Sequence, residues 1–287
     1  MDHDARAEGG GHRGELEIQL RIEQIERELG NPAIARATIT TLEALSDDPH
    51  KAGLVQWLQE GCGSNDGRYE IRSLLRCLAK KLEPRRYLEI GTRRGWSLAQ
   101  VLSETPACEV VSCDMWVTDY ADAPNPGPNL VREEIARVTD ATGTITFISG
   151  NSHDVLPVLF GQAPPHHNIP GTTEAATLIG SGSMEFDLIT VDGDHSALGS
   201  WWDLCDVMPH VALGGAVVFD DLIDWSDEVI GSAPESRYPN LHERPELAHS
   251  LLSLWRRAEE RFTNFRFVTA IDFPAGAPPV GFAIRMA

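Results

Sequence analysis

Two short apolar runs with an amphipathic stretch between them organise the second half of the chain. Residues 187–191 and 216–219 are predicted to be buried strands. Between the two runs, apolar side chains recur at roughly helical spacing, at Leu198, Trp202, Leu204 and Val207. Gly214 and Gly215 are predicted to break the chain before the second strand. A strand, a helix and a strand in this order predict a parallel pair with a crossover helix, so both strands end at the same edge of the sheet.

The same alternation extends over the rest of residues 84–287. Further strands are predicted over residues 86–90, 110–113, 144–148, 265–271 and 280–286. Helices are predicted from about residue 96 and over residues 131–138, 152–159 and 245–262. A Pro- and Gly-rich loop joins the last two strands, which is typical of an antiparallel hairpin. The pattern predicts an α/β fold with a seven-stranded, mostly parallel sheet that ends in this hairpin.

The first 83 residues carry helical patterns. Residues 1–14 are Gly-rich and charged, which is typical of a disordered tail. In residues 15–29 the apolar side chains form one helical stripe, made of Ile18, Ile22, Ile25 and Leu29. More helices are predicted over residues 32–45, 52–59 and 69–82. We therefore expect a helical cap over residues 15–83, whose first helix packs on its own domain or on a second subunit, followed by a main domain over residues 84–287.

Composition argues against several classes of protein. The 287 residues include 24 basic and 43 acidic side chains and carry a formal net charge of −19, which disfavours nucleic acid and anionic membranes as partners. Five cysteines without a CxxC spacing argue against a disulfide framework or a zinc-thiolate site and fit a reducing cytoplasm. The N-terminus lacks the apolar core of a signal peptide, and no apolar run reaches the length of a membrane span.

Acidic residues follow both strands of the organising stretch. Asp192 ends the first strand, and Asp220 and Asp221 end the second, so the three carboxylates are expected to converge. Carboxylates that meet either share protons or bind a cation, and oxygen ligands favour Mg²⁺. The alternative is that these acids simply end strands at a solvated edge. His195, three residues after Asp192, is a candidate general base or a histidine that only hydrogen-bonds near a helix start.

A glycine turn follows the first predicted strand of the main domain. Glu89, Gly91 and Gly95 form the motif E-x-G-x-x-x-G between strand and helix, where glycines let backbone amides approach a ligand. Asp114 ends the next strand, where an acid holds the hydroxyls of a bound ribose. An ordinary turn with a chance acid is the alternative for this pattern. The dinucleotide fingerprint G-x-G-x-x-G requires glycine where this chain has Arg93, which argues against NAD.

With this motif, residues 87–286 resemble the class I S-adenosylmethionine-dependent methyltransferases. The resemblance implies a Rossmann-like, doubly wound sheet with S-adenosylmethionine bound at the carboxyl edge. It also implies a set of cofactor-binding residues, namely Glu89, Gly91, Thr92, Gly95, Ser97, Asp114, Met115, Trp116, Asn151, Ser152 and Asp192. Trp116 either packs on the adenine or belongs to the core.

Within that family, the segments VDGDH and VVFDDL are similar to metal-dependent O-methyltransferases of catechols and of macrolide-antibiotic sugars. The resemblance implies that Asp192, Asp220 and Asp221 hold Mg²⁺ and that His195 is the catalytic base, with Asp194 as the other candidate. The acceptor would be a small molecule with a sugar or vicinal-diol hydroxyl, and a homodimer or larger homo-oligomer is expected. Proteins labelled cephalosporin hydroxylase share the resemblance, which leaves open a hydroxylase-type enzyme or a non-catalytic partner protein of antibiotic biosynthesis.

Two long polar loops without helix or strand, residues 118–128 and 161–183, are predicted, and both are expected to be lids that exclude water from the site. Tryptophans near the acids are candidates to line the acceptor pocket: Trp201, Trp202 and Trp225. For Trp202, core packing is the preferred interpretation.

Overall fold

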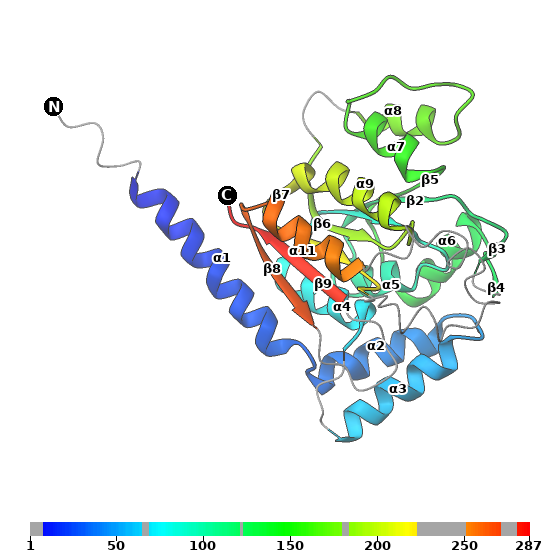
Figure 1. The fold of residues 1–287 in the computed structure, drawn as a ribbon. Coiled ribbons are helices and arrows are strands. Elements are labelled where there is room, and N and C mark those ends of the chain that lie inside the picture. Colours follow the sequence, from blue (N-terminus) through cyan, green and yellow to red (C-terminus); the bar gives the residue numbers. More distant parts are fainter. Residues whose placement is uncertain (1–7, 65–68, 121–122, 180–183, 223–250, 271–279) are drawn as a thin grey trace.

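A seven-stranded sheet forms the centre of the computed structural model, which describes residues 8–64, 69–120, 123–179, 184–222, 251–270 and 280–287 (Figure 1). Its strand order is β5-β2-β1-β6-β7-β9-β8. The strands are β1 (Arg86–Ile90), β2 (Glu109–Asp114), β5 (Ile145–Ser149), β6 (Phe186–Val191), β7 (Val211–Phe219), β8 (Phe265–Ala270) and β9 (Val280–Arg285). The first five strands in this order are parallel, and β9 runs antiparallel to both β7 and β8. The predicted fold class is therefore confirmed, including the closing hairpin.

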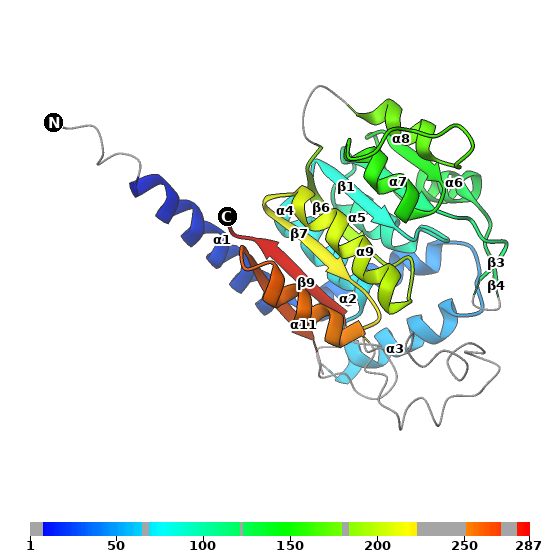
Figure 2. The same cartoon turned by 45° about the horizontal axis from the view of Figure 1, so that its top comes forward.

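Helices cover both faces of the sheet (Figure 2). The helices on one face are α4 (Ile71–Leu82), α5 (Trp96–Glu104) and α6 (Pro128–Val138). Those on the other are α7 (Ser152–Leu159), α8 (Thr172–Leu178), α9 (Ala197–Val207) with the short 3-10 helix η1 (Met208–His210), and α11 (Leu251–Arg261). Each face of the sheet has its own hydrophobic core, and successive residues of a strand point into opposite cores. Tyr87 and Leu188 pack on the first face, and Leu88 and Ile189 pack on the second. Burial on both faces explains why these strands read as continuous apolar runs.

Three further helices precede α4: α1 (Glu8–Glu28), α2 (Pro32–Ala44) and α3 (Lys51–Ser64). Helix α1 begins at Glu8, inside the stretch expected to be a tail, and its N-terminal end projects away from the body (Figure 1). The expected stripe packs inward, because Ile22 and Ile25 are buried against the same core as α4 and α5. None of the described helices has the length and hydropathy of a membrane span.

Two predictions about local structure in the second half are wrong. Gly214 and Gly215 do not precede the strand, because β7 begins at Val211 and passes through both glycines. Gly214 has φ +74°, and the pairing of β6 with β7 shifts register there, so the glycines make a bulge rather than a break. The segment 161–183 contains α8, which packs on α7 through the buried Ala175. Residues 180–183 lie outside the described residues.

Trp202 is also placed differently from the preferred interpretation. The side chain of Trp202 is 48% exposed and that of Leu198 is 53% exposed, whereas Leu204 and Val207 are fully buried. Positions two apart on an α-helix are separated by about 200°. Trp202 and Leu204 therefore face opposite sides of α9, and only the side of Leu204 meets the sheet. Trp225 lies outside the described residues.

The other predicted lid contains a short hairpin. Strands β3 (Asp119–Tyr120) and β4 (Ala123–Pro124) pair antiparallel within residues 118–128.

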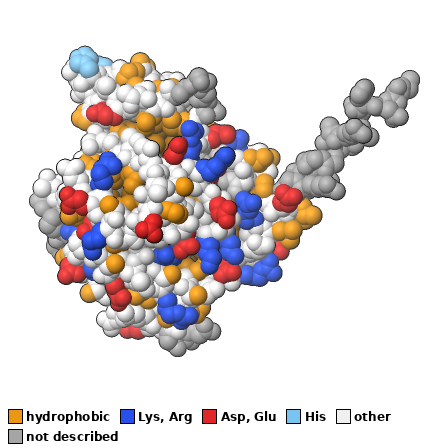
Figure 3. Space-filling model, turned by 180° about the vertical axis from the view of Figure 1, so that it is seen from behind, with side chains coloured by type: hydrophobic (Ala, Val, Ile, Leu, Met, Phe, Trp, Pro, Cys, Tyr) orange, Lys and Arg blue, Asp and Glu red, His pale blue; other side chains and the backbone are white. Residues whose placement is uncertain are grey.

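On the face of the molecule seen from behind, basic and acidic side chains are interspersed over the surface (Figure 3).

Candidate functional site

The glycine turn joins β1 to α5 and lies directly against the end of β6. Gly91 has φ +83°, and a Cβ there would overlap the carbonyl oxygen of Asp192. Gly95 has φ +69°, serves as N-cap of α5, and leaves no room for a Cβ beside Val131 of α6. Both glycines are therefore required by backbone conformation and by close packing. The turn and the first acid of the predicted metal site lie at one edge of the sheet.

Asp114 fixes the shape of this turn. Its Oδ2 atom accepts hydrogen bonds from the backbone N–H groups of Thr92, at 2.8 Å, and Arg93, at 2.7 Å. Its Oδ1 atom accepts from the backbone N–H of Trp116 at 2.6 Å. Trp116 has φ +52° and packs edge-on against Phe147. The acid that ends β2 thus ties together the two loops that flank the predicted ribose site.

The remaining candidates for the cofactor lie around this edge in different environments. Met115 is 61% exposed, whereas Ser97 is buried in the first turn of α5. The hydroxyl of Thr92 is buried and hydrogen-bonded to that of Ser112. Asn151 is the N-cap of α7 and directly precedes Ser152, the first residue of that helix.

Glu89 is a fully buried acid beneath the glycine turn. The hydroxyl of Tyr87 lies 3.1 Å from Glu89 Oε1 and 2.8 Å from Thr190 Oγ1. Glu89 Oε2 is buried and accepts no hydrogen bond. Burial raises the pKa of Glu89 to about 8, and the nearby Asp192 and Asp114 also raise it. Glu89 is therefore largely protonated at pH 7, and a cation bound beside it would favour its ionised form.

Three side chains at the carboxyl edge form a group with metal-ligand spacing. Asp192, His195 and Asp221 each offer one ligand atom, and these atoms all lie within 4.8 Å of one another. His195 Nε2 is 3.3 Å from Asp192 Oδ1, and His195 Nδ1 is 3.2 Å from Asp221 Oδ2. Asp221 has φ +52°, an uncommon conformation that acidic residues tolerate better than most. The structure thus brings together two of the predicted metal ligands and the predicted base.

Asp220, the third predicted ligand, is not a member of this group. Its backbone N–H donates to the carbonyl of Val191 at 3.3 Å, which keeps it at the same strand edge. Burial raises the pKa of Asp220 well above its usual value, and the charges of Asp192 and Asp221 act in the same direction. Burial likewise raises the pKa of Asp192. The acids at this edge are therefore difficult to ionise together, and a bound cation would stabilise their ionised forms.

Arg72, which the sequence did not single out, supplies part of that charge. It lies in the first turn of α4, with Nη1 2.7 Å from Glu70 Oε2 and its guanidinium 5.3 Å from the centre of the Trp96 ring. Burial opposes the charge of Arg72, but the charges of Glu70, Asp220 and Asp192 raise its pKa. The helical cap thus contributes a cation to the edge that carries the acids.

Asp194, the second candidate base, is held within its own turn. Its Oδ1 atom accepts from the backbone N–H of Ser196 at 2.8 Å, and its Oδ2 atom lies 3.2 Å from His153 Nε2. His153 Nδ1 lies 3.3 Å from Asp203 Oδ1, and Asp203 has no exposed surface. The pairing with Asp203 raises the pKa of His153 to about 9, and Asp194 contributes. A protonated His153 therefore links α7 to Asp194 and Asp203, the two ends of the segment that carries His195. No sequence motif indicated this role.

Residues 88–222 match a family model described as a methyltransferase domain. Among solved structures, the chain is similar to the O-methyltransferase TomG of Streptomyces achromogenes, involved in tomaymycin synthesis and solved with SAM, at 19% identity over 74% of this chain and 78% of that one, with a TM-score of 0.47. It is similar to the SAH-bound methyltransferase PaMTH1 of Podospora anserina at 18% identity over 80% and 85%, with a TM-score of 0.46. An O-methyltransferase of Bacillus cereus in complex with SAH matches at 14% identity over 88% and 90%, with a TM-score of 0.44. No curated protein matches the chain.

Proposed function

We propose that the chain is a Mg²⁺-dependent O-methyltransferase that uses S-adenosylmethionine, since its residues 88–222 match a family model described as a methyltransferase domain. The observation that carries the proposal is the contact between Gly91 and the backbone of Asp192. It puts the glycine turn and the group of Asp192, His195 and Asp221 at one edge, so a methyl donor and an activated hydroxyl can meet there.

The surroundings of the glycine turn suit a cationic cofactor with a ribose. Asp114, at the end of β2, holds the amides of Thr92 and Arg93 with its Oδ2 atom, and the second lone pair of its Oδ1 atom, which accepts from the backbone N–H of Trp116, would accept from a ribose hydroxyl. Glu89 lies buried beneath the turn with one oxygen atom that accepts no hydrogen bond. A sulfonium bound nearby is a positive charge that its ionised carboxylate would stabilise. The same feature would not favour a neutral or anionic ligand.

The acid group suits a hard divalent cation. Asp192 and Asp221 offer the carboxylate oxygens that Mg²⁺ prefers, and Asp220 lies at the same strand end. Mg²⁺ bound there would lower the pKa of a coordinated acceptor hydroxyl. His195 would take the proton of that hydroxyl at whichever ring nitrogen does not donate to its neighbouring carboxylate. S-adenosylmethionine held at the glycine turn would supply the methyl group, with its sulfur as the leaving group.

The acceptor class follows from the need to chelate. The proposed acceptor is a small natural product with two neighbouring oxygens, such as a sugar, another vicinal diol or a catechol, because a divalent cation held by Asp192 and Asp221 would bind such a pair. A place in antibiotic biosynthesis and a homodimer or larger assembly belong to the same proposal. The five cysteines are all free thiols, which suits a reducing cytoplasm.

A methylation assay tests the proposal. The protein would be incubated with S-adenosylmethionine and a panel of vicinal diols, catechols and sugars, in the presence of Mg²⁺ or of EDTA. The molecular masses of the products would be measured by mass spectrometry. We expect a product 14 Da heavier that disappears in EDTA, and a loss of at least a hundredfold in rate for Asp192→Asn and Asp221→Asn. Asp140→Asn, which removes an exposed carboxylate remote from the edge, is the matched control. Full activity of Asp192→Asn and Asp221→Asn in EDTA would exclude the metal from the mechanism.

A further inference from the structure

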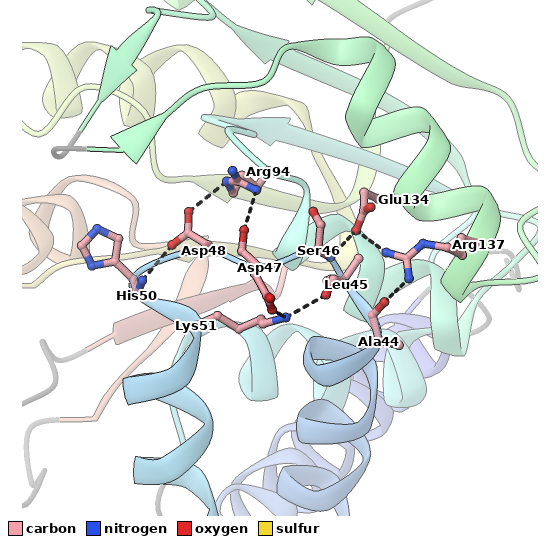
Figure 4. Close-up of polar contacts among 10 residues, drawn as sticks. All are labelled: Ala44, Leu45, Ser46, Asp47, Asp48, His50, Lys51, Arg94, Glu134 and Arg137. Atoms are coloured by element: carbon pink, nitrogen blue, oxygen red, sulfur yellow. Dashed lines mark hydrogen bonds and ion pairs between the residues drawn. The ribbon is translucent and has the colours of Figure 1, made fainter.

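The linker between α2 and α3 is fastened to the glycine turn. Figure 4 shows residues 44–51 beside Arg94, which belongs to the turn. Asp48 has a fully buried side chain, and its Oδ2 atom lies 2.9 Å from Arg94 Nε and 3.7 Å from Arg93 Nη2. Arg94 Nη1 also donates to the backbone carbonyl of Asp47 at 3.4 Å. One buried carboxylate of the helical cap therefore faces both arginines of the turn.

The linker itself has a fixed conformation. Asp48 Oδ1 accepts from the backbone N–H of His50 at 2.9 Å. Lys51 Nζ donates to the carbonyl of Leu45 at 2.7 Å and lies 2.9 Å from the carboxylate of Asp47. These contacts close the linker on itself, so the position of the Asp48 carboxylate does not depend on the arginines alone.

The linker is also anchored to α6, the helix that packs against Gly95. Glu134 Oε2 accepts from the backbone N–H of Ser46 at 2.7 Å and from Arg137 Nη2 at 2.7 Å. Arg137 Nη1 in turn donates to the carbonyl of Ala44 (Figure 4). The linker, α6 and the glycine turn thus form one connected unit beside the proposed cofactor site.

The charges of this unit matter because the proposed ligand is a cation. Arg93 and Arg94 place two positive charges in a turn that must accept a sulfonium. From this geometry, and resting on the proposed function, we propose that Asp48 is a positioning residue whose buried carboxylate offsets these charges, so that the turn accepts the positively charged donor and not only the neutral product. The product, S-adenosylhomocysteine, has lost the sulfonium charge but retains the other groups of the donor. Comparison of the two ligands therefore isolates the charge.

Calorimetric titration of both ligands tests this role. The dissociation constants of S-adenosylmethionine and S-adenosylhomocysteine would be measured for the unchanged protein, Asp48→Asn, Asp47→Asn and the double variant Asp48→Asn/Arg94→Gln. A unit charge at about 10 Å in an effective dielectric of about 20 changes affinity about tenfold or slightly more. We expect Asp48→Asn to raise the ratio of donor to product dissociation constants about tenfold, and the added Arg94→Gln to reverse most of that rise. Asp47→Asn makes the same chemical change at an exposed neighbour. It removes one exposed ion pair but keeps the bonds from Lys51 to the carbonyl of Leu45 and from the His50 amide to Asp48, so it should leave the ratio unchanged.

The controls separate the possible failures. Thermal melting would establish that each variant is folded, and Arg94→Gln alone provides a second test, because it should lower the same ratio. Equal weakening of both ligands in Asp48→Asn would assign Asp48 a purely structural role and overturn the inference, as would an unchanged ratio. If the unchanged protein bound neither compound, the proposed function would fall, and this inference with it.

Discussion

The buried carboxyl of Glu89 allows a quantitative prediction. Glutamine has nearly the same shape and size as the protonated acid and offers both a hydrogen-bond donor and an acceptor, but it does not titrate. Burial raises the pKa of Glu89 from 4.5 to about 8, and the residue has no exposed surface. The substitution therefore removes one buried ionisable group without creating a cavity.

The sign of the effect follows from linkage. An acid whose pKa is higher in the folded than in the unfolded protein contributes most to stability below pH 4.5, and that contribution is lost as the pH rises through about 8. Each pH unit in this interval costs about 1.4 kcal/mol, so the full interval costs up to about 5 kcal/mol. The unchanged protein should therefore lose stability relative to Glu89→Gln between pH 5 and pH 8. The difference corresponds to about 10 °C in melting temperature for a chain of this size.

Differential scanning calorimetry of both proteins from pH 5 to pH 9 measures this difference. Asp192 and Asp220 also have raised pKa values, but both remain in the two proteins, so the comparison measures the titration of Glu89 together with its interaction with Asp192. Glu109→Gln, at an exposed position of β2, is the matched control and should follow the unchanged protein. Parallel melting profiles of Glu89→Gln and the unchanged protein would refute the reasoning.

The same group should report on the cofactor. Because Glu89 is largely protonated at pH 7, binding of a sulfonium that favours the carboxylate should release up to about one proton. Titration calorimetry in buffers of different ionisation enthalpy measures that release, which should be absent in Glu89→Gln.

Three further predictions concern residues around the site. Gly91→Ala should abolish cofactor binding, measured by titration calorimetry, because its Cβ would overlap the carbonyl of Asp192 and its φ of +83° disfavours alanine. Trp255→Leu should lower the free energy of unfolding in urea by about 3 kcal/mol, because this buried ring packs on Gly281 and its Nε1 donates to Thr269. His153→Gln should melt below the unchanged protein at pH 6 but match it near pH 10, because a pKa raised from 6.5 to about 9 stabilises the fold only while the imidazole is charged; a gap that persists at pH 10 would contradict this.

The central strands and the glycine turn could be predicted because each depends on local sequence. Buried parallel strands need uninterrupted apolar residues, and the residues 187–191 lie within β6 as expected. Gly91 and Gly95 have positive φ angles, which is the reason such a motif is recognisable at all. The order of strands and helices then places Asp192 and Asp221 at the same edge of the sheet, because the two strands that precede them are joined by a crossover connection and run parallel.

Features that depend on packing or on small differences in local energy were not predictable in this way. The pair Gly214 and Gly215 is equally compatible with a break and with a bulge, and only the partner strand β6 decides. The apolar residues of α9 occupy both of its sides, so their spacing alone could not show that Trp202 faces outward. Helix α8 lies between segments rich in proline, glycine and histidine, whose composition outweighed the short helical pattern.

The charged residues Asp48, Arg72 and His153 were missed for a different reason. None belongs to a motif, and each lies near the candidate site because segments remote in sequence meet there. Asp48 meets Arg94 across 46 positions, and His153 meets Asp194 across 41. The pattern of residues along the chain does not show which charged side chains from distant segments will pair.

These remote contacts join the helical cap closely to the main domain. Helices α2 and α4 share one hydrophobic core with α5, so the cap has no separate interior. It also supplies a cation, Arg72, to the edge that carries the acids and an anion, Asp48, to the turn that carries two arginines. The cap thus places charge of the opposite sign on each half of the site. Under the proposed function the metal and the sulfonium would both be cations, so the charges of each half would be balanced separately, and Asp48 and Arg72, which lie outside residues 88–222, would contribute to both balances.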